Sequence, residues 1–227
     1  MPFERVAKFI RQLTHDVRNS LSAVDLESAF IAELVTDPEA ADEVRKLRAM
    51  VSNAAKILRD LSQNFQPVTV ELMPWQAAII FEELSSRLPK QFPEDAATVD
   101  LECRIKGEMI QVDLEQFIRA LCNVLLNAFQ FRQEGVRTSL ACFAEGGFVV
   151  FEVREPKRTF ESPLPVEEWG SEPLFSTRPG GYGLGLYRAR QVLEAHGGQL
   201  QIKREGDSLL TRVVLPIYKE NPDSEAS

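Results

Sequence analysis

The chain has 227 residues, 44% of them hydrophobic, with 34 acidic against 26 basic side chains and a formal net charge of -8. This composition is typical of a globular protein, and the negative charge argues against nucleic acid as a partner. No apolar run reaches the roughly 18 residues that a membrane span needs, and the N-terminus lacks the apolar core of a signal peptide. We therefore expect a cytoplasmic protein that has no membrane span and meets other proteins or small molecules.

The first 65 residues carry apolar side chains at spacings that alternate between three and four. Residues 6–34 follow this pattern as one helix with a heptad seam. Asp37, Pro38 and Glu39 then mark the start of a second helix with the same spacing. Two helices joined by a few residues predict an antiparallel hairpin, which cannot bury both apolar seams by itself. We expect two copies to form a dimeric four-helix bundle; packing of the hairpin against the rest of the chain is the alternative.

His15 falls at the heptad position farthest from the seam of the first helix. Residues four apart share a helix face, so His15 and Asn19 are neighbours, with Asp16 beside them. An imidazole that faces water between a carboxylate and an amide suits a nucleophile or a phosphate acceptor. Taken alone, the stretch favours an ordinary surface histidine over a phosphate acceptor.

The pattern changes after Asn64, which places a domain boundary near Gln66. We expect domains at residues 1–66, 67–218 and 219–227, the last a disordered tail. The second domain is predicted to be an α/β layer structure in which about three helices cover a mixed sheet. Its helices are expected at 75–88, 113–131 and 185–196, and its strands at 68–72, 99–105, 110–112, 136–143, 148–153, 199–204 and 209–217.

Two features of this domain suggest chemistry. Residues 154–180 form a long connection without periodicity, which is usually functional and often a lid. It leads into four glycines within six residues at the start of a helix, where backbone amides suit phosphates, and Arg178 could add a charge-assisted contact. A flexible linker would also be rich in glycine.

Asn123 and Asn127 lie four apart on one face of the apolar helix at 113–131. Amides in such a helix need a partner, which a phosphate-bound metal would supply. Mg²⁺ prefers oxygen ligands and commonly shares its shell with phosphates. Bonds to neighbouring backbone are the alternative.

Together these motifs resemble the transmitter core of the sensor histidine kinase family, over residues 5–217. The stretch 15–19 resembles its phosphoacceptor box and 121–128 its asparagine box. The stretches 175–186 and 195–198 resemble its phenylalanine and second glycine boxes. The resemblance implies an α+β fold, in which a dimeric helical hairpin precedes an α/β sandwich of the histidine kinase and chaperone ATPase type.

The resemblance also implies a function, two-component signal transduction, with ATP and Mg²⁺ as cofactors. His15 would take the γ-phosphoryl group of ATP and pass it to an aspartate of a response regulator. Asp16 would orient the imidazole as a base, and Asn19 would position water for dephosphorylating the partner. The nucleotide and its metal would contact Asn127 as the Mg²⁺ ligand, Asn123 on the same face, and the glycines Gly181, Gly183 and Gly185, with Arg178 nearby.

One box departs from the family pattern. The strand at 148–153 should lead into Asp-x-Gly-x-Gly, whose Asp recognises adenine. Here Glu155 replaces the Asp, while Lys157 and Thr159 replace the glycines. A longer carboxylate could still reach an amino group, but the two side chains would crowd the adenine end. A smaller departure is Ser20, where many relatives carry Pro.

Four functions follow from this pattern. The intact second glycine box favours an ATP-dependent histidine kinase. The altered first box favours an ATP-independent histidine phosphotransferase or a response-regulator phosphatase. A non-catalytic dimerisation scaffold is less compatible with the intact acceptor box. A chaperone-type ATPase is disfavoured by the heptad hairpin that carries His15.

Overall fold

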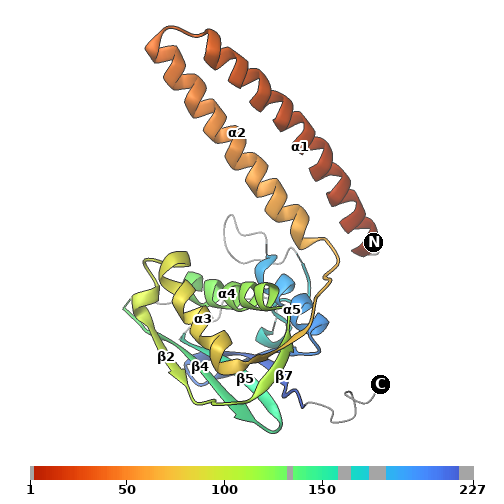
Figure 1. Ribbon diagram of the computed structural model, residues 1–227, viewed down its shortest axis with the longest axis vertical. Coiled ribbons are helices and arrows are strands. Elements are labelled where there is room, and N and C mark those ends of the chain that lie inside the picture. The colour runs from red at the N-terminus through yellow and green to blue at the C-terminus, as the bar shows by residue number, and fades with distance from the viewer. Residues whose placement is uncertain (1–2, 132–134, 158–164, 174–182, 220–227) are drawn as a thin grey trace. The chain divides into compact units, whose positions relative to one another are not determined.

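The computed structural model describes residues 3–131, 135–157, 165–173 and 183–219, in two compact units, Met1–Pro67 and Val68–Ser227. The first unit is an antiparallel hairpin of α1 (Phe3–Leu34) and α2 (Pro38–Asn64) (Figure 1). The second is a mixed α/β sandwich. The predicted fold class, a helical hairpin followed by such a sandwich, is confirmed for the single chain.

The start of α2 shows why the hairpin turns where it does. The Asp37 carboxylate accepts a hydrogen bond from the Ala40 N–H at 2.9 Å, which satisfies one of the free amides of the first turn. Pro38 has no N–H to satisfy and is the first helical residue. The predicted helix start is therefore confirmed.

Among the hairpin side chains that the structure describes, the most buried are Thr14, Ser28 and Val51 in the helices and Phe65 just after α2. Most of the described seam of α1 is exposed in the single chain, from 37% at Val17 to 65% at Leu34, whereas Ile10 and Leu21 are half-buried. A second row on α2 is also exposed, at Leu47, Met50 and Ile57. Each helix thus presents an apolar row that the hairpin alone does not cover.

The second unit is built on a five-stranded sheet in the order β2 (Val99–Cys103), β4 (Thr138–Glu145), β5 (Phe148–Pro156), β7 (Ser208–Pro216) and β6 (Gln199–Glu205). β2 runs parallel to β4, and the other neighbours are antiparallel. One face carries the helices α3 (Ala77–Gln91), α4 (Leu114–Phe131) and α5 (Gly185–Ala195) (Figure 1). β1 (Met73–Gln76) and β3 (Met109–Val112) form a separate antiparallel pair, and the short 3-10 helices are η1 (Ala96–Thr98) and η2 (Val166–Glu168).

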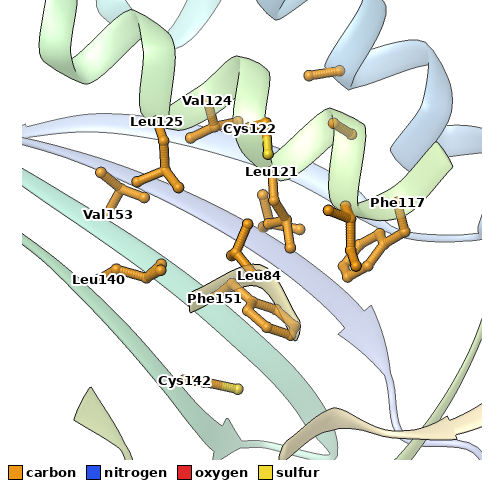
Figure 2. Close-up of a cluster of buried hydrophobic side chains, with 14 of the residues drawn as sticks. Leu84, Phe117, Leu121, Cys122, Val124, Leu125, Leu140, Cys142, Phe151 and Val153 are labelled. Atoms are coloured by element: carbon orange, nitrogen blue, oxygen red, sulfur yellow. The ribbon is translucent and has the colours of Figure 1, made fainter. Parts of the chain in front are cut away.

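The core lies between α4 and the sheet. Along β5 every second side chain points to the helices, and Val149, Phe151 and Val153 are buried there. Phe117 of α4 meets Phe151 edge to face, with ring centroids 5.5 Å apart (Figure 2). The next inward position of β5 is Glu155, a carboxylate at the end of an apolar row.

Two predicted elements near residue 70 are wrong. Residues 68–72 form no strand, and β1 begins only at Met73 and includes Pro74 and Trp75. Pro74 can occupy this place because β1 belongs to a two-stranded sheet, where a missing donor is tolerated at an edge. The following helix accordingly starts at Ala77, and it includes Pro89 in its last turn rather than ending before it.

The predicted tail at 219–227 lies outside the described residues from position 220 onward. Among the helices that the structure describes, none is both long enough and apolar enough to cross a membrane.

Candidate functional site

His15 lies on α1 with its side chain 57% exposed. Its Nδ1 atom is 3.1 Å from an oxygen of Asp16 and 3.4 Å from the amide nitrogen of Asn19. The helix therefore brings together the three residues that the sequence suggests for the acceptor. We call His15, Asp16 and Asn19 the acceptor group.

The hydrogen-bond geometry indicates which nitrogen of the imidazole carries the hydrogen. The bond to His15 holds the pKa of Asp16 below its usual value, with a further contribution from Gln12, so the carboxylate is ionised near neutral pH and can only accept. The hydrogen on the His15 ring therefore lies on Nδ1, and the lone pair lies on Nε2. Asn19 also approaches Nδ1, but the shorter contact with a charged group decides the proton position.

Gln12 belongs to the same cluster, although sequence reasoning did not select it. Its amide donates to both Asp16 oxygens, at 3.0 and 3.2 Å. Gln12 precedes Asp16 by four residues, so the helix repeat was the signal that could have found it. The carboxylate is held from one side by Gln12 and from the other by His15.

In the second unit, α4 and α5 run antiparallel. The Asp113 N–H just before α4 donates at 3.0 Å to Nε2 of His196, which follows α5. On its other side the His196 ring contacts the Val192 carbonyl, 2.6 Å from Nδ1. This link joins the start of α4 to the end of α5, so the later part of α4 lies toward the beginning of α5.

The beginning of α5 has the features of an anion site. Gly183 has a φ of +62°, which glycine adopts without strain. Among the described residues, no side chain caps the helix at Leu184, and a Cβ at Gly185 would meet none of them within 4 Å. The first amides of a helix are donors of the kind that bind anions.

The facing part of α4 adds amides and positive charge. Asn123 and Asn127 are half-buried on α4, and neither side chain makes a hydrogen bond with another described residue. Burial, together with the neighbouring Arg119 charge, lowers the pKa of Arg188. Two guanidinium groups are therefore close together one turn from Asn123, an arrangement that favours an anion nearby.

Glu155 lies at the end of β5 and is 1% exposed. The Lys157 ammonium is 3.5 Å from its Oε1 atom, and Lys157 is itself buried. Burial raises the pKa of Glu155 to about 7, with Lys157 acting against that increase. We call these two residues the Glu155–Lys157 pair.

Two further side chains adjoin this pair. Thr138 precedes Ser139, the registered partner of Arg154, so Thr138 and Glu155 lie side by side on the inward face. The Thr138 hydroxyl and both Glu155 oxygens are buried and make no hydrogen bond with the described residues. Lys157 also lies over the Trp169 ring, 5.7 Å from its centroid.

Some predicted residues lie outside the described part of the chain, namely Arg178, Gly181 and Thr159, with much of the predicted lid at 154–180. Within the described residues, no cluster of three or more His, Cys, Asp or Glu side chains could hold a metal ion.

Comparisons with known proteins extend over nearly the whole chain. No protein-family model matches. The alginate biosynthesis sensor protein KinB of Pseudomonas aeruginosa is 23% identical over 229 residues, covering 95% of this chain and 38% of that protein. The sensor histidine kinase ZraS of Escherichia coli is 25% identical, covering 94% of this chain and 46% of that protein. This chain is a distant homologue of the sensor histidine kinases.

A solved structure of a similar protein has the same fold. Full-length ShkA in complex with AMPPNP matches with a TM-score of 0.71 at 18% identity, over 94% of this chain and 46% of that one. The predicted resemblance to a histidine kinase transmitter core is confirmed. The chain spans less than half the length of these relatives.

The structure also identifies what sequence reasoning missed. The sequence suggested that Lys157 would crowd the adenine end or contact phosphate, and its burial against Glu155 was not foreseen. Thr138 and Arg188 gave no sequence signal, because a threonine at a strand start and an arginine on a helix are ordinary. Only the register of β4 with β5 and the contact of α4 with α5 bring them to the site.

Proposed function

We propose that this chain is the transmitter core of a two-component histidine kinase. It transfers the γ-phosphoryl group of ATP to His15, and from there to an aspartate in the receiver domain of a response regulator. The observation that carries the proposal is the exposed His15 imidazole, held by Asp16 on a regular helix, in a chain homologous to sensor histidine kinases.

The acceptor group supports a direct attack by His15. Because Nδ1 carries the proton toward Asp16, the Nε2 lone pair on the opposite side of the ring attacks phosphorus. The Nε2–P bond forms as the bond from the γ-phosphorus to the bridging oxygen breaks, and ADP leaves with that electron pair. The positive charge that develops on the imidazole is stabilised by the Asp16 carboxylate.

The return path uses the same exposed surface. In the transfer to a response regulator, a receiver carboxylate attacks the phosphorus and the N–P bond breaks toward Nε2. Asn19 lies beside the imidazole and would position a water molecule when the regulator is dephosphorylated. Exposure of the acceptor group gives a receiver domain access to His15.

The second unit would bind the phosphoryl donor. The first amides of α5, with Gly183 and Gly185, suit the phosphates, and the predicted contacts of Gly181 and Arg178 would add to them. Asn127 would supply an oxygen to Mg²⁺, with Asn123 on the same helix. When bound, Mg²⁺ would neutralise charge on the phosphates during transfer.

We also propose that the chain acts as a homodimer through its hairpin. The exposed apolar rows of α1 and α2 support this arrangement. Two hairpins packed seam to seam would bury both rows in a four-helix bundle.

The Glu155–Lys157 pair supports a second candidate, an ATP-independent histidine phosphotransferase or a response-regulator phosphatase. A base amino group would need the Glu155 carboxylate, which Lys157 contacts in this structure. In that case phosphate would reach His15 from a phosphorylated receiver domain. The intact phosphate end of the site makes the kinase our first choice.

Incubation with γ-labelled ATP and Mg²⁺ tests the proposal. Wild-type protein should acquire an acid-labile, base-stable label, which His15→Ala abolishes and Asn127→Ala strongly reduces. Ser22→Ala, an exposed change on the same helix, should not affect labelling. An unlabelled wild type without nucleotide binding would refute the kinase, and label arriving from a phosphorylated receiver would support the second candidate.

A further inference from the structure

The surroundings of Glu155 point to a role for Lys157 that the kinase reaction does not require. Lys157 is two residues after Glu155, just beyond the end of β5 at Pro156, and both side chains are buried. The Lys157 N–H donates to the Asp207 carbonyl at 2.6 Å, which fixes its backbone against the turn before β7. The lysine is therefore placed beside the carboxylate by its backbone.

Lys157 is held on two sides. Its ammonium lies 3.5 Å from Glu155 and 5.7 Å from the centroid of the Trp169 ring, a cation–π distance. Trp169 is fixed in turn, because Arg190 of α5 donates to its carbonyl at 3.1 Å. A lysine side chain normally extends into water, and these two contacts help to hold it in the interior.

The contact with Lys157 nevertheless leaves the Glu155 carboxylate able to accept further hydrogen bonds. A charge-assisted hydrogen bond is usually about 2.8 Å long, and the 3.5 Å contact is well beyond that length. Both Glu155 oxygens and the Thr138 hydroxyl are buried without hydrogen bonds to described residues. Buried acceptors that lack donors would gain from a ligand that carries an N–H group.

We propose that Lys157 is an internal competitor for the nucleotide base, and that its ammonium occupies the place beside Glu155 that the exocyclic amino group of adenine would take. The proposal rests on the proposed function, because it takes Glu155 as the base-reading carboxylate. ATP then binds only to molecules in which Lys157 has moved away. The apparent Kd equals the intrinsic Kd divided by the fraction of such molecules.

Titration calorimetry with Mg²⁺–ATP tests this inference. Lys157→Met keeps the length of the side chain and removes its charge, and it should lower the Kd by about tenfold or more if the free fraction is about a tenth or less. Lys203→Met is the matched control, since Lys203 is an exposed lysine of β6 whose nearest carboxylate is 3.9 Å away. The control should bind ATP as the wild type does.

Two double variants avoid an unpaired buried charge and test the role of the Glu155 carboxylate separately from that of Lys157. Glu155→Gln with Lys157→Met keeps an acceptor oxygen without a buried charge, and it should also bind ATP about tenfold more tightly. Glu155→Leu with Lys157→Met removes both the acceptor and the competitor, and it should gain nothing over wild type. Thermal unfolding establishes that each variant is folded.

If the folded Lys157→Met and Glu155→Gln/Lys157→Met variants bind ATP no more tightly than wild type, the inference is overturned. His15 labelling of the same variants separates the two ideas. Tighter binding without label on His15 would contradict only the kinase, whereas label with unchanged affinity would contradict only the role of Lys157.

Discussion

The acceptor group on α1 and the Glu155–Lys157 pair on β5 each place a carboxylate beside a basic side chain, in opposite environments. Asp16 is exposed and bonded to both Gln12 and His15, and its pKa is lowered. Glu155 is buried with both oxygens unbonded to described residues, and its pKa is raised. In water the partner decides the protonation state, whereas in the interior the loss of hydration does.

This difference in environment means that different forces position the two carboxylates. Exposed charged groups keep most of their hydration, so the spacing of the acceptor group on α1 can follow the needs of the reaction alone. A buried ion pair is costly to desolvate and must be balanced by its surroundings. The predictions below change one region at a time, beginning with the largest expected effect.

Charge in the exposed seam of α1 should break the dimer that presents the acceptor group. Val24→Asp places two carboxylates in a symmetric interface. Each copy should weaken the free energy of association by about 2 kcal/mol, so the dimer dissociation constant should rise by about 1,000-fold. Leu26→Asp is the control, because Leu26 is 75% exposed and lies off the seam. Sedimentation equilibrium measures both, and an unchanged dimer in Val24→Asp would refute the seam as the interface.

The stability of the chain should depend on pH through Glu155. Between pH 4.5 and about 7 the folded chain keeps a proton on Glu155 that the unfolded chain has released. The contribution of Glu155 to stability is therefore greatest below pH 4.5 and is lost between about pH 4.5 and 7, by about 3 kcal/mol in all. Glu155→Gln should remove this loss, as measured by urea unfolding from pH 5 to 8.

Glu205 is a control whose pKa shift, and therefore whose effect on the pH dependence of stability, has the opposite sign. Its pKa is lowered, first by the bond from Arg154, so its contribution is present at neutral pH and is lost on acidification. Glu205→Gln should therefore lower stability at neutral pH and remove only the part of the pH dependence that lies below about pH 4.5. The same pH dependence in wild type and Glu155→Gln would contradict the account of the buried pair.

Asn127→Ala should slow labelling of His15 by about 100-fold while leaving the acceptor group intact. The reason is the loss of one oxygen ligand from a metal that neutralises phosphate charge. Chelation of Mg²⁺ with EDTA should stop labelling in wild type. Gln130→Ala, an exposed change on the same helix, should have little effect, and equal rates for the two variants would exclude a metal role for Asn127.

Gln12→Ala should have the smallest effect, about a threefold decrease in the rate of His15 labelling. Gln12 only positions Asp16, which still has the bond to His15. Lys8→Ala, one turn away and also exposed, is the control. A loss as large as that in His15→Ala would show that Gln12 contacts the reacting groups directly.

Periodicity and caps predicted much of this structure. The hairpin follows from apolar spacing and from Asp37, and α4 follows from its apolar run and from Asp113, whose Oδ1 accepts from the Gln116 N–H at 3.2 Å. The error at residues 68–76 arose because Pro74 fits a helix start and an edge strand equally well. Only the pairing of β1 with β3 decides between them.

The site was predictable where it depends on local spacing. His15, Asp16 and Asn19 share one helix face, so the sequence brings them together without tertiary information. Glu155 and Lys157 required knowledge of which face of β5 is buried. Lysine is rarely placed in an interior, so no sequence pattern predicted that it would pair with the carboxylate there.

The central claim is that His15 receives its phosphoryl group from ATP. Peptide mapping of phosphohistidine after incubation with Mg²⁺–ATP, in parallel with a phosphorylated receiver domain, tests it most directly. We predict phosphorylation of His15 with ATP as the donor, at a rate that falls about 100-fold when Asn127 is changed to Ala. Phosphohistidine that appears only with the phosphorylated receiver, or on a residue other than His15, would contradict the account.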